Sequence, residues 1–140
     1  MPNMNRILVI DDNHAILDVV KVILEDHGYV VDVMSDGDGA LQRVLNFQPS
    51  LIIIDVFLSG NDGRQLCRKL KSAEITKNIP IIMFSAQSKM EEVLSLCNAN
   101  DFIAKPFDVG ELLEKVRFHL EYSLQSSVGS HQSTANSTNG

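Results

Sequence analysis

Five short apolar runs, separated by segments with helical periodicity, are the feature of this 140-residue sequence that most restricts its fold. They occupy residues 7–10, 29–34, 51–55, 81–84 and 101–104. The first, third and fourth runs are continuous and rich in β-branched residues, which is typical of interior parallel strands covered on both faces. The second run alternates and the fifth is brief, so we expect these two at the edges of a sheet.

Apolar residues at helical spacing fill the segments between the runs. The five sets are Ile16, Val19, Val20, Ile23 and Leu24; Ala40, Leu41, Val44 and Leu45; Leu66, Cys67 and Leu70; Val93, Leu94 and Cys97; and Leu112, Leu113, Val116 and Leu120. Gly28 is placed to end the first helix in a left-handed conformation. Ser88 with Glu91 predicts a capping box for the fourth helix, and Asp108 with Glu111 predicts one for the fifth. Strands that alternate with helices indicate an α/β fold with a doubly wound, five-stranded parallel sheet.

The chain length suits one domain with a substantial core. From about Ser126 the sequence is small and polar, and it cannot bury enough apolar surface to offset the entropy of ordering. We therefore expect one domain over residues 1–124 and a disordered polar tail over residues 125–140.

Composition excludes several classes of protein. Hydrophobic residues at 44% and charged residues at 21% are ordinary for a soluble globular protein. No apolar run approaches the roughly 20 residues of a membrane helix, and the N-terminus lacks a secretory signal, so we expect a cytoplasmic protein with no membrane partner. The formal net charge of −6 argues against direct binding of nucleic acid.

Neither the cysteines nor the histidines form a ligand pattern. Cys67 and Cys97 are widely spaced and each lies in a helical apolar pattern, so we expect buried free thiols. The histidines show no paired spacing, and we expect all of them to be ordinary surface residues. They are His14, His27, His119 and His131.

Polar residues follow four of the apolar runs. Asp11 and Asp12 end the first run and Asp55 ends the third. Ser85 follows the fourth run and Lys105 follows the fifth. Because ligands of open parallel sheets bind outside the carboxyl ends of the strands, we expect these groups to converge.

The converging groups have the chemistry of phosphoryl transfer. Three carboxylates suit Mg²⁺, with Mn²⁺ as a possible substitute, and a metal ion beside an ammonium and a hydroxyl neutralises and positions a phosphoryl group. Asp55, at the end of the most apolar run, is best placed to act as a nucleophile and form an acyl phosphate. Lys105 would pair with one phosphoryl oxygen, and the Ser85 hydroxyl would donate to another.

Each of these residues, taken alone, also has a purely structural interpretation. Asp11 and Asp12 could equally cap the first helix. Asp55 could begin a turn, Lys105 could be a solvated strand end, and Ser85 could be a turn hydroxyl. The convergence of four strand ends favours the functional interpretation.

Four motifs, ILVIDDN, LIIIDVFLSGNDG, IIMFSAQS and DFIAKPFD, follow one another over residues 5–122. In these motifs, their order and their spacing, the sequence resembles the receiver domains of bacterial two-component response regulators. The resemblance implies a flavodoxin-like (βα)5 fold with strand order 2-1-3-4-5. It also implies that Asp55 accepts a phosphoryl group from a sensor histidine kinase or a histidine phosphotransfer protein.

The resemblance also assigns a role to each site residue. Asp11, Asp12 and Asp55 would bind Mg²⁺ together with the backbone carbonyl of Phe57. Lys105 would contact the phosphoryl group.

Further roles come from the same resemblance. Ser85 would be the switch hydroxyl and Phe102 the aromatic switch residue, plain core being the alternative for Phe102. The bond before Pro106 would be cis. Phe57 and Gln87 would tune the lifetime of the phosphoryl group. A bulky apolar Phe57 cannot orient an attacking water, which predicts slow self-dephosphorylation.

The sequence departs from the family pattern at two positions. Ser59 stands where proline is usual, and Asn98 stands where glycine is common. Asparagine tolerates left-handed backbone angles better than most residues, so the second change should be mild.

These features predict a stand-alone receiver that catalyses only its own phosphorylation and dephosphorylation and is not an enzyme acting on a metabolite. It would signal to another protein through its fourth helix, fifth strand and fifth helix, as a monomer or a phosphorylation-dependent dimer. One alternative is an unphosphorylated docking module. A second is a small Mg²⁺-dependent phosphatase, which is disfavoured because Phe57 stands where such enzymes carry a second acid.

Overall fold

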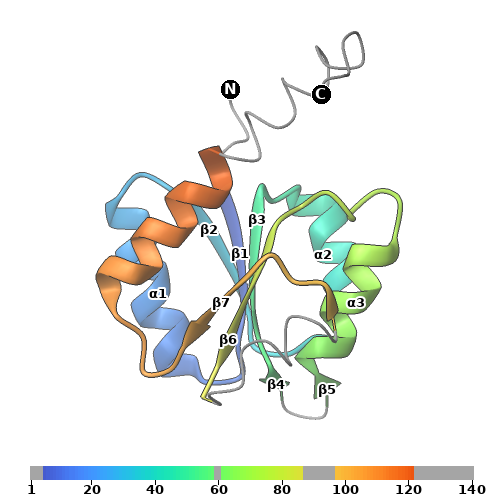
Figure 1. Cartoon of the computed structure of the whole chain (residues 1–140), viewed down its shortest axis with the longest axis horizontal. Helices are drawn as coiled ribbons and strands as arrows, with labels where there is room; N and C mark the ends of the chain where they lie inside the picture. Colours follow the sequence, from blue (N-terminus) through green and yellow to red (C-terminus); the bar gives the residue numbers. More distant parts are fainter. Residues whose placement is uncertain (1–4, 59–60, 87–96, 122–140) are drawn as a thin grey trace, which may run out of the picture.

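The protein, seen in a computed structural model, is built on a five-stranded parallel sheet (Figure 1). The structure describes residues 5–58, 61–86 and 97–121. The strands of the sheet are β1 (Arg6–Ile10), β2 (Val30–Met34), β3 (Leu51–Asp55), β6 (Ile81–Ser85) and β7 (Asp101–Ala104). Their order is β2-β1-β3-β6-β7, with every pair parallel. Counted in chain order within this sheet, that is the predicted 2-1-3-4-5, and the two predicted edge strands, β2 and β7, are confirmed.

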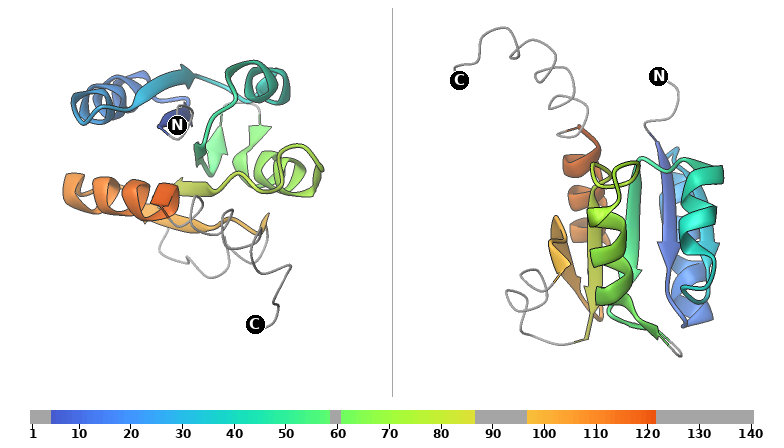
Figure 2. Two further views of the ribbon diagram at one scale, coloured as in Figure 1. Left: turned by 90° about the horizontal axis from the view of Figure 1, so that it is seen from above. Right: turned by 90° about the vertical axis from the view of Figure 1, so that its right-hand side faces the viewer.

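Helices cover both faces of the sheet. They are α1 (His14–Asp26), α2 (Ala40–Phe47), α3 (Gly63–Ser72) and a helix over residues 109–121. Figures 1 and 2 show α1 and the helix over residues 109–121 on one face and α2 and α3 on the other. The doubly wound architecture is therefore confirmed. The predicted fourth helix and its capping box lie mostly outside the described residues, as does the predicted polar tail. None of the helices in the described ranges is long and apolar enough to span a membrane.

The interior strands send alternate side chains into two separate cores. On β3, Ile52 and Ile54 belong to the core under α2 and α3, whereas Leu51 and Ile53 belong to the core under α1 and the helix over residues 109–121. All of these side chains are fully buried. Covering on both faces is the physical reason why the run is apolar without alternation.

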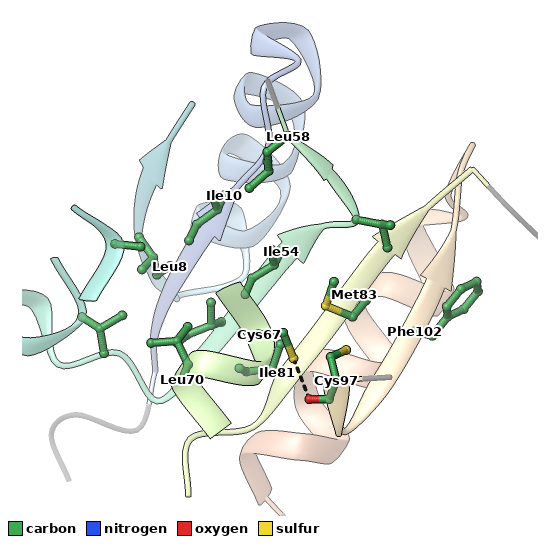
Figure 3. Packing of buried hydrophobic residues seen from close by; sticks show 14 residues of the cluster. Leu8, Ile10, Ile54, Leu58, Cys67, Leu70, Ile81, Met83, Cys97 and Phe102 are labelled. Carbon is green, nitrogen blue, oxygen red and sulfur yellow. Dashed lines mark hydrogen bonds between the residues drawn. The ribbon is translucent and has the colours of Figure 1, made fainter. Parts of the chain in front are cut away.

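Both cysteines lie in the core under α2 and α3 (Figure 3), so the prediction that they are buried is confirmed. They are buried free thiols, and the Cys67 thiol donates to the backbone carbonyl of Cys97 at 3.3 Å. The bond joins α3 to the chain just before β7.

Local capping agrees with the sequence at most positions. Gly28 has φ of 92° just beyond α1, and Asp108 Oδ2 accepts from the backbone N–H of Glu111 at 2.9 Å. Asn98 has φ of 60°, the left-handed conformation in which asparagine replaces glycine at low cost. The N-cap of α1 is Asn13, whose side chain accepts from Ile16 N at 3.1 Å. Asn13 therefore caps this helix in place of the two preceding aspartates.

The expectation that all histidines are ordinary surface residues is wrong for His119. His14 and His27 are exposed, and His131 lies outside the described residues. His119 is only 7% exposed, and its Nε2 lies 2.7 Å from Asp101 Oδ2. The partner carboxylate begins β7 and is far from His119 in sequence, so helical spacing alone gave no sign of the pair.

Candidate functional site

The predicted polar residues meet at the carboxyl ends of the strands. Asp11 directly follows β1, Asp55 ends β3, Ser85 ends β6 and Lys105 directly follows β7. Asp11, Asp12 and Asp55 each offer a carboxylate oxygen, and these oxygens lie within 4.8 Å of one another. The chain thus brings together the three acids that could hold a metal ion.

Lys105 connects two of these acids. Its Nζ lies 2.9 Å from Asp11 Oδ2 and 3.2 Å from Asp55 Oδ1. Asp11 is fully buried and Asp55 is 6% exposed. Two buried carboxylates therefore share one ammonium, which leaves negative charge in a site of low dielectric.

The Asp11 carboxylate has a spare ligand position. Its Oδ1 accepts from the backbone N–H of Asn13 at 2.9 Å. Its Oδ2 is within ion-pair distance of Lys105 but receives no aligned hydrogen bond. Among the buried side-chain oxygens and nitrogens of the described residues, only Asp11 Oδ2 lacks a hydrogen-bond partner. Buried polar atoms are normally satisfied, so a hard cation with oxygen ligands fits this position.

Burial and charge shift the pKa of the paired groups. Burial, and next the charge of Asp11, raise the pKa of Asp55 to about 6 against the opposing effect of Lys105. Burial acts to lower the pKa of Lys105, but the carboxylates of Asp11 and Asp55 outweigh it and leave that pKa above its ordinary value. Lys105 therefore stays charged, and Asp55 is the acid whose ionisation the fold opposes.

Aromatic rings support Lys105 from below. Its Nζ lies 5.9 Å from the centre of the Phe84 ring, and Phe84 stacks on Phe107 with ring centres 5.6 Å apart. The backbone N–H of Lys105 donates to the carbonyl of Ser85 at 2.8 Å, and the Lys105–Pro106 bond is cis. The backbone bond fixes the start of the Lys105 residue beside β6, and the Phe84 ring lies on the path of its side chain toward the acids. Nothing in the sequence indicated this role for Phe84, because an aromatic residue inside an apolar run resembles ordinary core.

The remaining predicted site residues lie around this centre. The Ser85 side chain is buried at the end of β6. Phe102 lies on β7, opposite Met83 in the ladder, and is 1% exposed. Phe57 is 49% exposed. Gln87, like Ser59, lies outside the described residues.

Phe57 lies on a hairpin that the sequence analysis did not predict. Strands β4 (Phe57–Leu58) and β5 (Asn61–Asp62) pair antiparallel, with Phe57 opposite Asp62. The Asp62 carboxylate caps α3 and receives two bonds from the Arg64 side chain, at 2.9 and 3.0 Å. The Arg64 guanidinium carbon also lies 5.8 Å from the centre of the Phe57 ring. Arg64 thus ties the hairpin beside Asp55 to the start of α3.

Gly63 allows α3 to begin directly against Asp55. A Cβ atom at this position would overlap the backbone carbonyl oxygen of Asp55. The N–H of Gly63 donates to the carbonyl of Val56 at 2.8 Å, so the close approach is held in place. The sequence contained a signal for this residue, since a glycine after an N-cap aspartate suggests a close backbone approach.

Comparison with known proteins agrees with the fold. A sequence model described as the response regulator receiver domain matches residues 7–117. The chain therefore belongs to the response regulator receiver domain family. Domains of this family are signalling modules of two-component systems, and phosphorylation and Mg²⁺ binding are characteristic of them.

A curated relative is the DNA-binding dual master transcriptional regulator RpaA of Synechocystis sp. The two are 39% identical over 116 residues, which cover 81% of this chain and 48% of RpaA. The chain thus spans about half the length of that relative.

Solved structures of similar chains include two receiver domains. A CheY-like receiver domain protein from Methanospirillum hungatei has a TM-score of 0.79 and 29% identity, with 87% of this chain and 98% of that chain covered. A signal receiver domain of a histidine kinase from Syntrophus aciditrophicus has a TM-score of 0.76 and 34% identity, with 84% of this chain and 90% of that chain covered.

Gly63→Ala is expected to destabilise the protein by about 3 kcal/mol or more, because the new methyl group meets backbone rather than a flexible side chain. Urea unfolding followed by circular dichroism measures the change. Gly110→Ala is the matched control, since its Cβ would meet only the Asp108 side chain, and its cost should be far smaller. Equal stability of the two variants would contradict the close approach of α3 to Asp55.

Asp55 is expected to make the metal-free protein less stable as the pH rises. The folded carboxyl keeps its proton up to a pH of about 6 and the unfolded one only to about 3.8, so the folded state binds more protons in this window. Asp55→Asn should remove this slope and raise the free energy of unfolding at neutral pH by at most about 3 kcal/mol. Urea unfolding in EDTA between pH 4 and about pH 7 measures both effects.

The control for this titration is Asp62→Asn. The hydrogen bonds with Arg64 lower the pKa of Asp62. The Asp62 carboxylate therefore stabilises the folded state at neutral pH, and this stabilisation is lost as the pH falls. The Asp62 variant should therefore lose stability at neutral pH. If Asp55→Asn leaves the pH dependence of the free energy of unfolding unchanged, that result would contradict the raised pKa of Asp55.

Proposed function

We propose that this chain is a phosphorylation-controlled receiver in which Asp55 accepts a phosphoryl group from a phosphohistidine. The donor is a sensor histidine kinase or a histidine phosphotransfer protein. The observation that carries the proposal is the Lys105 ammonium, 2.9 Å from Asp11 and 3.2 Å from Asp55, beside a third carboxylate. A purely structural ion pair has no need of three clustered acids.

Mg²⁺, or Mn²⁺ in its place, would neutralise charge on the phosphoryl oxygens when bound. Asp11, Asp12 and Asp55 would hold it with the backbone carbonyl of Phe57. The spare position on Asp11 Oδ2 supports this assignment, since the acid is buried and its second oxygen lacks an aligned donor.

Asp55 acts as the nucleophile in the transfer. One of its carboxylate oxygens forms a bond to phosphorus as the phosphorus–nitrogen bond of the donor breaks, and the imidazole leaves. Lys105, released from sharing its charge between two carboxylates, pairs with a phosphoryl oxygen. The Ser85 hydroxyl donates to another phosphoryl oxygen. The acid is consumed in a single transfer, so the protein acts on itself and not on a metabolite.

Phosphorylation then shifts a conformational population. Ser85, at the end of β6, and Phe102, on β7, are the switch residues. A downstream protein would contact the face formed by the fourth helix, β7 and the helix over residues 109–121. The proposed receiver acts as a monomer or as a phosphorylation-dependent dimer. We also propose that this chain does not bind nucleic acid directly. RpaA is named as DNA-binding, but the match covers only 48% of its length.

Incubation with acetyl phosphate and Mg²⁺ is expected to add one phosphoryl group of about 80 Da to the wild type and none to Asp55→Asn, because only Asp55 is placed as the nucleophile. Intact-mass spectrometry measures the adduct. Asp62→Asn is the control, since it removes a neighbouring carboxylate outside the site. If neither acetyl phosphate nor a phosphorylated histidine kinase modifies the wild type, the proposal fails in favour of an unphosphorylated docking module.

The phosphoryl group on Asp55 is expected to persist for minutes rather than seconds, because the exposed Phe57 side chain cannot orient an attacking water. Phe57→Asn should shorten the half-life several-fold, since an amide can hold that water. Decay of the phosphorylated mass after removal of acetyl phosphate measures both values. Phe118→Asn, at another exposed phenylalanine, should leave the half-life unchanged. A half-life of seconds in the wild type would contradict this role of Phe57.

A further inference from the structure

The backbone of Phe102 is bound on both of its polar groups by side chains. Its N–H donates to Asp101 Oδ1 at 2.8 Å, and its carbonyl accepts from Lys115 Nζ at 2.7 Å. β7 is an edge strand, and the free side of such a strand usually presents its N–H and C=O groups to water. At this one residue the edge is instead occupied by charged side chains, one of them from the helix over residues 109–121.

His119 completes the arrangement. Its Nε2 lies 2.7 Å from Asp101 Oδ2, while Asp101 Oδ1 also lies 3.0 Å from Lys115 Nζ. Both oxygens of one carboxylate are thus fixed, one by His119 and the other by Lys115 and the Phe102 N–H. The His119 ring is buried and meets the ring of the adjacent Phe118 edge to face at 5.0 Å between centres.

The partners in this cluster stabilise the ionised form of the Asp101 carboxylate. Burial acts to raise the pKa of Asp101, but the bonds from His119, the Phe102 N–H and Lys115 outweigh it and leave that pKa below its ordinary value. Glu111 Oε2 lies 3.3 Å from Lys115 Nζ and adds a second carboxylate to the ammonium.

The opposite edge of the sheet has a similar arrangement without a histidine. On β2, the N–H of Val33 donates to Asp32 Oδ1 at 3.0 Å, and Arg43 Nη1 lies 2.8 Å from Asp32 Oδ2. The same guanidinium reaches the Val33 carbonyl at 3.5 Å. The bond from the cation to the carbonyl is therefore longer at Val33 than at Phe102. The β2 edge, which has no histidine, can therefore be compared with the β7 edge, which has His119.

We propose that Asp101, Lys115 and His119 form a clamp that fixes the β7 backbone at Phe102 to the helix over residues 109–121, with His119 as the positioning residue that sets the Asp101 carboxylate. Because the N–H and the carbonyl of Phe102 are both held, phosphorylation moves the Phe102 side chain and leaves its backbone in place. This coupling role rests on the proposed phosphorylation switch. The clamp itself does not, since its contacts are independent of Asp55.

Amide hydrogen exchange followed by NMR tests the clamp in the unphosphorylated full chain. His119→Phe keeps a ring but removes the bond to Asp101, and it should speed exchange of the Phe102 amide at least about tenfold relative to the Ile53 amide in the central strand. His119→Gln offers an amide nitrogen near the position of Nε2 and should restore exchange to near the wild-type rate. The Val33 amide should be unaffected by either variant.

The outcomes separate a clamp from a general effect on stability. Equal acceleration at Phe102, Ile53 and Val33, or no acceleration at Phe102, would overturn the proposal. If His119→Phe does not fold, Lys115→Met provides the test, because it removes the donor to the Phe102 carbonyl while keeping an apolar stem of similar length. Unchanged exchange at Phe102 and Ile103 in that variant would also overturn the clamp.

A second measurement tests the coupling. Protein labelled with fluorophenylalanine is treated with acetyl phosphate and Mg²⁺, and its phosphoryl content is read by intact mass. At equal phosphoryl content, the change in the Phe102 fluorine resonance should be at least about twofold smaller in His119→Phe than in wild type and in His119→Gln. An equal change in all three would overturn the coupling role. A wild type that takes up no phosphoryl group, from acetyl phosphate or from a phosphorylated histidine kinase, would overturn the proposed function and leave the exchange result standing.

Discussion

The shared ion pair of Lys105 with Asp11 and Asp55 is the interaction on which the rest of the site depends. Removing charged groups from water costs free energy, and one ammonium between two buried carboxylates only partly offsets that cost. The surrounding structure holds the cluster in place, with Phe84 and Phe107 supporting the lysine and Gly63 letting α3 start against Asp55. The protein thus maintains a site that is under electrostatic strain, in which three clustered carboxylates could hold a metal ion.

Parallel topology is what makes this arrangement possible. The four strand ends that supply the site come from different parts of the chain, yet a parallel sheet brings their carboxyl ends to one edge. The two cores, one on each face of the sheet, anchor the strands. The polar residues at the strand ends therefore need not supply the packing that stabilises the fold. Stability and chemistry are therefore supplied by different parts of each strand.

The sequence predicted the features that follow from periodicity and strand ends. The five strands, their edges, the two buried thiols and the grouping of Asp11, Asp12 and Asp55 all follow from local pattern. It missed features that depend on contacts between distant segments. The pairing of His119 with Asp101 joins a helix to a strand, and the support of Lys105 by Phe84 joins two neighbouring strands.

Local pattern misjudged individual positions in helices as well. Val19 and Leu41 fit the apolar spacing of their helices, yet they are 48% and 40% exposed. In α1 the buried residues are Leu17, Val20 and Leu24, so the face that packs on the sheet is rotated from the one that the spacing suggested. Periodicity identifies a helix more reliably than it identifies the side that is buried.

The aspartates before Val33 and Phe102 have a consequence for assembly. Open sheet edges are templates on which the strand of another molecule can pair, which leads to fibres and aggregates. In this chain each edge strand has the N–H of one residue occupied by the preceding aspartate, and a cation from a helix contacts the carbonyl of the same residue. At Val33 and at Phe102 the backbone groups that another strand would need for pairing are thus already engaged, which disfavours extension of the sheet at either edge.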